Sequence, residues 1–278
     1  MNKTATDYNK ELPIGVFDSG VGGLTVLKAL TMRLPHERFL YLGDCARLPY
    51  GTKSSGTVTR YALQAASVLA SRGVKLMVIA CNTASATALD AVREAHPGIP
   101  VVGVVEPGAQ TACRATRSGR IAVIATESTI RGRAYHEAIL ALRPDAEVTG
   151  HPCPLFVSLA EEGWHTGDIA EAVAARYLDP VFNTPDAPDT LVLGCTHFPL
   201  LRQAIGNVIN PEAVIVDSAR TTAHSVCLQL DELAMNTANT TPGQVSFLTT
   251  DDAARFARTG EGFLGRGIAE ADVELVDL

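Results

Sequence analysis

Short apolar runs rich in β-branched residues alternate with longer stretches of helical character along this chain of 278 residues. This alternation is typical of parallel strands that are joined by crossover helices, so it restricts the chain to an α/β fold with mainly parallel sheets. We expect strands at Ile14–Asp18, Phe39–Leu42, Val74–Ala80, Val101–Val105, Ile121–Ala125, Thr190–Gly194, Val214–Asp217, Val245–Leu248 and Val273–Leu278.

The segments between these strands have the length and composition of helices. We expect helices at Gly23–Leu34, Ser54–Arg72, Ala84–His96, Glu127–Leu142, Asp168–Leu178, Pro199–Ile209, Ala219–Leu233 and Asp251–Thr259. Ser54 stands where the second of these helices should begin, and serine is a favoured N-cap because its side chain accepts from a free backbone N–H.

The chain length favours two domains, and 46% hydrophobic residues are ample for a core in each. A Pro/Gly-rich stretch at 95–100 and the dipeptide Asn210-Pro211 mark the expected boundaries. We therefore expect a first domain of residues 1–100 plus 212–278 and a second of residues 101–211. Both would be doubly wound α/β domains with mainly parallel sheets, related by pseudo-symmetry, with the active site in the cleft between them.

The overall charge and the chain's ends limit the function classes. A net charge of −7 argues against a general surface for nucleic acid or anionic membranes. The polar stretch from Met1 to Leu12 predicts no signal peptide, and no apolar run approaches the roughly 18 residues of a membrane helix. We expect a cytoplasmic protein whose six cysteines stay reduced. Their spacing matches no zinc site, so we expect no metal.

Two of the cysteines directly follow expected strands in different halves of the chain. Cys81 comes after Val74–Ala80, and Cys195 after Thr190–Gly194. Ligands of open α/β sheets bind just outside the carboxyl ends of strands, so these thiols could face each other across a cleft. There they could move a proton from one face of a carbon to the other. His197 could stabilise a thiolate at Cys195 or assist proton transfer.

The remaining cysteines carry weaker signals. A lone cysteine is most often a small buried hydrophobe, and we interpret Cys113, Cys153 and Cys227 in that way. Cys45 lies in a polar loop and stays open between the two interpretations.

A glycine-rich turn, Gly20–Gly23, follows the first strand and leads into a helix. Such a turn presents backbone N–H groups to an anion. It is no dinucleotide fingerprint, because Thr25 stands where that pattern needs glycine. The glycines alone favour a simple tight turn, whereas Asp18, at the strand's carboxyl end, is at least as favourable a candidate for function as for structure.

Three further polar segments leave a functional and a structural interpretation open. The loop around Pro49, Tyr50 and Gly51 follows a strand and could contact a ligand or be an ordinary loop. The segment 125–130 suits a carboxylate, or simple capping of a helix. The acids Glu161 and Glu162 end a predicted helix, where they are disfavoured unless they have a function or are exposed.

Taken together, these motifs resemble glutamate racemase, the cofactor-independent enzyme that interconverts L- and D-glutamate. The matching blocks cover residue 14 to about 220 in the family's order. They are Phe-Asp-Ser-Gly-Val-Gly-Gly-Leu, Gly-Asp-x-Ala-Arg-x-Pro-Tyr-Gly, Ala-Cys-Asn-Thr-Ala-Ser-Ala, Val-Glu-Pro-Gly and Gly-Cys-Thr-His-Phe-Pro-Leu-Leu. Position 45 is cysteine where the family pattern has threonine, and Ala125 and Ser128 replace expected glycines.

The resemblance implies a role for each matching residue. Cys81 would take the proton from D-glutamate and Cys195 from L-glutamate, with Asp18, Glu161 and His197 as auxiliary groups; the motif favours Glu161 over Glu162. It implies no cofactor, allows a homodimer, and implies D-glutamate supply for peptidoglycan. Substrate would be bound by Asp18, Ser19, Pro49, Tyr50, Gly51, Cys81, Asn82, Thr83, Thr126, Thr129, Thr196 and His197.

The chemistry itself also requires a pair of bases. With the substrate fixed, one base would return most protons to the face they left, so racemisation needs an acid/base group on each face. Without a cofactor, the developing carbanion depends on aimed donors in a dry, closed cleft.

Three alternatives remain at this point. An aspartate or other amino-acid racemase would use the same thiol pair. A periplasmic-type binding protein also has two α/β domains around a cleft. A cysteine hydrolase would use Cys195 as nucleophile and His197 as base, but would give Cys81 no role.

Overall fold

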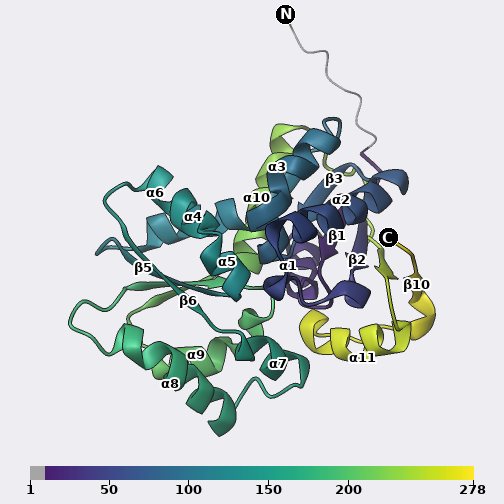
Figure 1. Ribbon diagram of the computed structural model, residues 1–278. Helices are drawn as coiled ribbons and strands as arrows, with labels where there is room; N and C mark the ends of the chain where they lie inside the picture. The colour runs from purple at the N-terminus through teal and green to yellow at the C-terminus, as the bar shows by residue number, and fades with distance from the viewer. Residues whose placement is uncertain (1–9) are drawn as a thin grey trace, which may run out of the picture.

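The computed structural model describes residues 10–278, which form two parallel sheets (Figure 1). The first sheet has six strands in the order β10-β9-β2-β1-β3-β4, and every pairing in it is parallel. Its strands are β1 (Ile14–Asp18), β2 (Phe39–Gly43), β3 (Leu76–Ile79), β4 (Val101–Gly103), β9 (Val245–Thr249) and β10 (Val273–Leu275).

The second sheet has four parallel strands in the order β6-β5-β7-β8. Its strands are β5 (Arg120–Ala125), β6 (Glu147–Pro152), β7 (Thr190–Gly194) and β8 (Val214–Asp217). Together with the first sheet, this confirms the predicted α/β fold with two parallel-sheet layers.

The expected domain boundaries need a correction of a few residues. β4 pairs with β3 in the first sheet, although it lies beyond the boundary expected at residue 100. β8 pairs with β7 in the second sheet, although it lies beyond residue 211. The Pro/Gly-rich stretches mark the turn before each of these strands, whereas the chain passes to the other sheet only after the strand.

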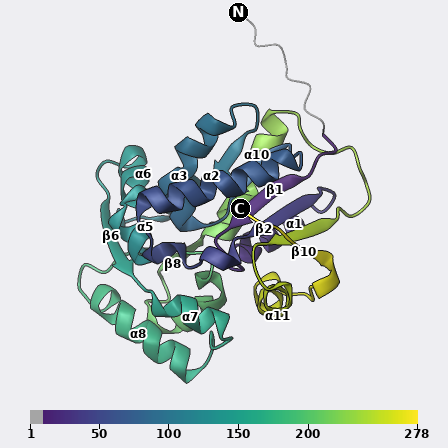
Figure 2. The same ribbon diagram turned by 45° about the vertical axis from the view of Figure 1, so that its right-hand side comes forward.

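Helices cover both sheets, and one of them joins the two halves of the molecule (Figures 1 and 2). α10 lies after β8 in the chain, yet it packs on α1 of the first half as well as on α4. The helices are α1 (Leu24–Arg33), α2 (Ser55–Ser71), α3 (Asn82–Ala95), α4 (Val105–Ala115), α5 (Glu127–Arg131), α6 (Ala134–Leu142), α7 (Leu155–Glu161), α8 (Asp168–Phe182), α9 (Arg202–Val208), α10 (Ser218–Glu232) and α11 (Ala253–Leu264). Short 3₁₀ turns lie at Cys45–Arg47, Tyr50–Thr52, Phe198–Leu201 and Glu270–Asp272.

The prediction of Ser54 as an N-cap is confirmed, since its side chain accepts from the backbone N–H of Thr57. The prediction of one helix over Glu127–Leu142 is wrong. The helix is broken between α5 and α6, where Gly132 ends the first segment and Arg133 has a left-handed backbone with φ of 56°. A non-glycine residue in this conformation ends regular helix geometry, so α6 starts afresh.

Two elements of the second half have no clear signal in the sequence. α4 contains Pro107 and Gly108, which read as helix breakers, but proline is tolerated in a first turn. β6 is a mostly exposed edge strand with Gly150 in its centre and Pro152 at its end. Edge strands need no alternation of apolar residues, so the sequence pattern misses it.

The cores of the two halves are continuous. β1, β2 and β3 are buried along their whole length, as parallel strands covered on both faces should be. One cluster of buried apolar side chains runs from Val16 and Leu27 in the first half, through Val226 of α10, to Leu193 and Phe198 in the second. The strand ends are therefore held by a packed interior on both sides of the cleft.

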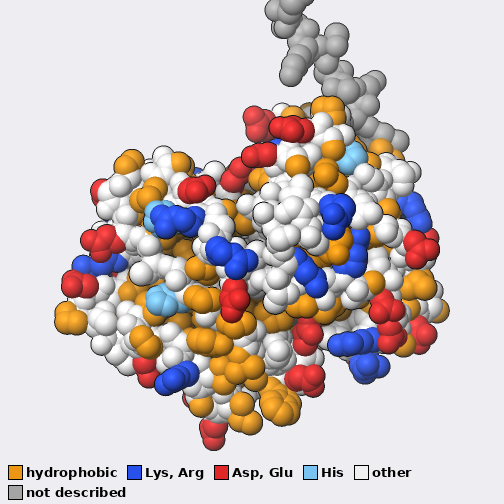
Figure 3. Space-filling view, in the orientation of Figure 1, with side chains coloured by type: hydrophobic (Ala, Val, Ile, Leu, Met, Phe, Trp, Pro, Cys, Tyr) orange, Lys and Arg blue, Asp and Glu red, His pale blue; other side chains and the backbone are white. Residues whose placement is uncertain are grey.

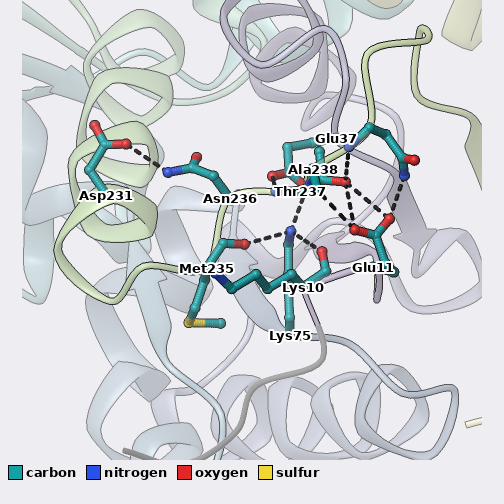
Figure 4. A network of polar contacts seen from close by, with 10 residues as sticks. Lys10, Glu11, Glu37, Lys75, Asp231, Met235, Asn236, Thr237 and Ala238 are labelled. Carbon is teal, nitrogen blue, oxygen red and sulfur yellow. Dashed lines mark hydrogen bonds and ion pairs between the residues drawn. The ribbon is translucent and has the colours of Figure 1, made fainter.

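A buried polar network fixes the chain where it returns to the first sheet (Figure 4). Lys75, just before β3, pairs with Glu37 at 2.6 Å, and both side chains are almost fully buried. The Lys75 ammonium also donates to the carbonyls of Met235 and Lys10 at 2.9 and 2.7 Å. Glu37 in turn accepts from the backbone N–H of Thr237 at 2.8 Å. These contacts attach the segment that follows α10 to the residues just before β2 and β3 of the six-stranded sheet.

The surface carries mixed charges. On the face shown in Figure 3, Lys and Arg side chains are interspersed with Asp and Glu and form no continuous basic area. Among residues 10–278, no helix combines the length and apolar character needed to cross a membrane.

Candidate functional site

The carboxyl ends of the central strands of both sheets meet at one place. β1 ends at Asp18 and β3 is followed by Cys81 in the first half, while β7 is followed by Cys195 in the second. Both cysteines are buried, with 5% and 6% of their surface exposed. The thiolate form of Cys195 contributes to the raised pKa of Cys81, so the two sulfurs lie within electrostatic reach of each other.

Cys81 stands at the N-cap of α3. Its sulfur accepts from the backbone N–H of Ala84 at 3.5 Å, and its thiol donates to Ser19 Oγ at 3.5 Å. Burial, first, and the charge of Asp18 raise the pKa of Cys81 to about 12, and these hydrogen bonds only partly offset the increase. A thiol in this setting is protonated near neutral pH.

Cys195 has a different partner set. Its sulfur lies 3.8 Å from Nδ1 of His197, and the other ring nitrogen lies 3.1 Å from Oε1 of Glu161. Burial alone would lower the pKa of His197, but the hydrogen bonds to Cys195 and Glu161 raise it to about 10. The hydrogen bond between His197 and Glu161 also lowers the pKa of Glu161. A protonated imidazole at this position can donate to a thiolate at Cys195.

Glu161, and not its neighbour, is the acid that contacts His197. It ends α7, which packs against the turn after Cys195. The unfavourable position of an acid at a helix C-terminus is thus compensated by an ion pair across to the cysteine motif.

Asp18 is fully buried beside the glycine-rich turn. Its Oδ2 accepts from the backbone N–H of Gly20 at 3.0 Å, and its Oδ1 has no hydrogen-bond partner among residues 10–278. Burial raises the pKa of Asp18, while the charge of His197 acts in the opposite direction. The pKa of Asp18, a residue of the first half, therefore depends on the charge of His197 in the second half.

Glycine is required where the two halves touch. A Cβ atom on Gly22 would lie 2.4 Å from Nδ1 of His197 and 2.5 Å from Oγ1 of Thr196. A Cβ on Gly51 would lie 2.7 Å from the Cβ of Thr126. Real Cβ atoms do not approach other atoms so closely, so these glycines allow the halves to close on the site.

Hydroxyl groups bridge the same interface. Thr83, Thr126 and Thr129 form a triangle with Oγ1 atoms 3.0 to 3.1 Å apart. On the other side, Oγ1 of Thr25 donates to the carbonyl of Thr196 at 2.9 Å. Hydroxyls can turn either their proton or their lone pairs toward a ligand, so the triangle is suited to a carboxylate.

The loop after β2 is held by a residue that the sequence analysis missed. Asp44 is fully buried and accepts from the hydroxyls of Tyr50 and Thr250 and from the guanidinium of Arg47. Tyr50 is likewise buried, with 1% of its surface exposed. Asp44 appears in the sequence between glycine and Cys45, and only its tertiary contacts distinguish it from an ordinary loop acid.

Cys45 lies near this site but outside its centre. It lines a cavity of about 410 Å³ together with Leu48, Glu161 and Arg255. Burial raises the pKa of Cys45 to about 11. Cys113 lies elsewhere, with its sulfur on the carbonyl of Ile139.

Two buried thiols, one from each half and within electrostatic reach of each other, fit the class of two-base racemases. Sequence comparison agrees with this class, because the profile of the Asp/Glu/hydantoin racemase family matches residues 25–226. The chain belongs to that family. Within it, glutamate racemase from Geobacter metallireducens is 52% identical over 254 residues, which cover 91% of this chain and 92% of the relative. This chain is thus a member of the glutamate racemase branch.

Solved structures of glutamate racemases have the same fold. The enzyme from Francisella tularensis, in complex with D-glutamate, has a TM-score of 0.89 and 38% identity, covering 96% of this chain and 98% of that one. Isoform RacE1 from Bacillus anthracis has a TM-score of 0.91 and 36% identity, with 97% and 99% covered. The similarity covers nearly the whole of each chain, so the arrangement of the two sheets is a family feature.

Proposed function

We propose that this protein interconverts L- and D-glutamate by transferring the α-proton between two cysteines. The observation that supports this best is the placement of Cys81 and Cys195 at strand ends of opposite sheets, where both are buried and interact electrostatically. In bacteria D-glutamate is a component of peptidoglycan, so the reaction would supply the cell wall. The cytoplasmic location expected from the sequence fits this role and stays a prediction.

In the direction from L- to D-glutamate, a Cys195 thiolate takes the α-proton and forms an S–H bond. The electron pair left on the α-carbon is shared with the adjacent carboxylate, and the carbon becomes planar. The Cys81 thiol then gives its proton to the opposite face. The reverse direction uses the same atoms with the roles exchanged.

The surroundings of the two thiols differ. Burial and the charge of Asp18 raise the pKa of Cys81 and favour its protonated form. Beside Cys195 lies His197, whose raised pKa keeps a donor next to this sulfur, and Glu161 holds that imidazole in position. One thiol and one thiolate is the combination that one turnover requires.

The polar groups around the cysteines would bind the two carboxylates and the ammonium group. Thr83, Thr126 and Thr129 present hydroxyls on one side of the cleft, and Thr196 lies on the other. Asn82 and Ser19 flank Cys81. Pre-set donors in a dry cleft stabilise the developing negative charge more than water would. The loop that contains Pro49, Tyr50 and Gly51 would cover the bound substrate.

A hydrolase is the second candidate because Cys195, His197 and Glu161 form a hydrogen-bonded series like that of cysteine hydrolases. That function leaves the buried Cys81 without a role. Aspartate is a second substrate candidate for the racemase itself, and the exchange assay below compares it directly with glutamate.

The deciding experiment follows the α-proton in deuterated water. With L-glutamate we expect D-glutamate that carries deuterium at the α-carbon, and the same from the other enantiomer. L-aspartate should exchange much more slowly. If neither glutamate enantiomer exchanges or racemises, the proposed function is wrong.

The cysteines can be tested singly. We expect Cys81→Ala and Cys195→Ala each to reduce racemisation by at least about a thousandfold, because general acid–base groups of this kind contribute factors of that order. Cys113→Ala, which removes a thiol away from the cleft, is the matched control and should keep full activity. Racemisation at an undiminished rate in either cleft variant would show that its thiol is dispensable.

A further inference from the structure

The side chain of Asn82 is unequally satisfied. Its Oδ1 accepts a hydrogen bond from the hydroxyl of Tyr135 at 2.7 Å. Its Nδ2 is buried and has no partner among residues 10–278. A buried donor without a partner is costly, and in a binding site it is a donor kept for a ligand. Asn82 lies directly after Cys81, at the first position of α3, so its amide is close in the chain to one of the two thiols.

Tyr135 is held rigidly by the second half of the molecule. It lies on α6 and is 3% exposed. A Cβ on Gly108 would lie 3.0 Å from Cε1 of its ring, and a Cβ on Gly194 would lie 3.1 Å from Cε2. Two glycines thus make room for the ring from both edges, and the ring has little freedom to turn away from Asn82.

This placement connects the two cysteine motifs. The hydroxyl of Tyr135 bonds the residue after Cys81, and its ring packs against Gly194, the residue before Cys195. Because α3 and α6 belong to opposite halves, the hydrogen bond between Tyr135 and Asn82 also joins the two halves.

The hydroxyl of Tyr135 remains protonated. Burial raises the pKa of Tyr135, and the charges of Cys195 and Asp217 raise it further. With its proton directed to Oδ1, the tyrosine leaves Nδ2 of Asn82 free to donate. The opposite orientation of the amide would present an oxygen to a carboxylate and repel it.

We propose that Tyr135 is a positioning residue, which fixes the amide of Asn82 so that Nδ2 donates to a carboxylate of the substrate. The inference rests on the proposed function, since it assumes an amino-dicarboxylate in the cleft. The carboxylate is already charged in the bound substrate, so loss of this contact should weaken binding more than it slows chemistry.

The test is Tyr135→Phe, which removes the hydroxyl and keeps the ring between the two glycines. We expect KM for both glutamate enantiomers to rise roughly tenfold, the effect of one lost hydrogen bond to a charged group, while kcat changes less than about threefold. Tyr177→Phe is the matched control: its hydroxyl bonds the backbone N–H of Leu155 in the same half, away from the cleft, and KM should not change.

A double variant separates positioning from a general structural effect. In an Asn82→Ala background, Tyr135→Phe should leave KM unchanged, because there is no amide to orient. KM does not depend on the fraction of folded enzyme, so the result holds even if the variant is less stable. The proposal is overturned if Tyr135→Phe leaves KM unchanged, or if its effect persists in full without Asn82. Absence of glutamate exchange in the unaltered protein would instead refute the proposed function.

Discussion

At the scale of single residues, the two thiols share a position but differ in their partners. Cys81 donates to the hydroxyl of Ser19 and accepts from a backbone N–H at the N-terminus of α3. Cys195 has His197, which is paired with Glu161. The pair of motifs predicts two bases, but only the contacts show that an imidazole paired with an acid stands beside one of them, Cys195, and none beside Cys81. The acid that makes the difference comes from α7, more than thirty positions away in the sequence.

The His197–Glu161 pair should make stability depend on pH. The pKa of His197 is raised to about 10 from an unfolded value near 6.5, and that of Glu161 is lowered. The histidine's contribution is complete below pH 6.5 and is lost as pH rises toward 10. The acid's contribution is present above its unfolded pKa and is lost as pH falls below it. The pair therefore contributes most between about pH 4.5 and 6.5.

We expect Glu161→Gln to lower the free energy of unfolding by about 2 kcal/mol near pH 6 and by progressively less toward pH 10. Denaturant unfolding across this range measures the difference. Glu162→Gln, at the exposed neighbouring position, should match the unaltered protein throughout. A deficit for Glu161→Gln that stays constant or grows with pH would contradict this assignment.

At the scale of elements, parallel strands were predictable and their exceptions have local causes. The buried strands β1, β2, β3, β5 and β7 stand out as apolar runs because both of their faces are covered. α4 and β6 were missed because proline and glycine within them are tolerated in a first turn and at a sheet edge. The glycine-rich turn after β1 was found, but the reason for one of its glycines lies in the opposite half, because Gly22 faces His197.

Gly22→Ala tests this close approach. The added methyl group would meet His197 and Thr196, so the halves cannot close to the same distance. We expect kcat/KM to fall roughly a hundredfold, the effect of displacing catalytic groups by about an ångström, while the melting temperature changes little. Gly56→Ala is the control, since a Cβ there meets nothing within 4 Å. Full activity of Gly22→Ala would show that the turn does not limit closure.

At the scale of the whole molecule, a continuous core joins the two halves, and a buried ion pair in the first half anchors the segment that follows α10. α10 leaves the second sheet, packs on α1 and ends at the network around Lys75. Removing one partner of a buried pair leaves an uncompensated charge, whereas replacing both by apolar residues is often tolerated.

We therefore expect Lys75→Ala to cost about 3 to 5 kcal/mol in the free energy of unfolding, measured by urea denaturation. The double variant Lys75→Met with Glu37→Leu should recover most of this loss. Arg72→Ala removes an exposed pair with Glu274 on the same sheet and should cost less than about 1 kcal/mol. Equal losses in Lys75→Ala and Arg72→Ala would show that burial does not set the strength of the Lys75 pair.

The sequence by itself determined the α/β class, the two cysteine-bearing strand ends and the polar residues next to them. These features are local, because strand periodicity, turn chemistry and motif spacing are all recorded within a few neighbouring residues. Tertiary structure decided which sheet β4 and β8 join, that Glu161 pairs with His197, and that Asp44, Thr25 and Tyr135 support the site. Those contacts join segments far apart in the chain, and their partners follow only from packing.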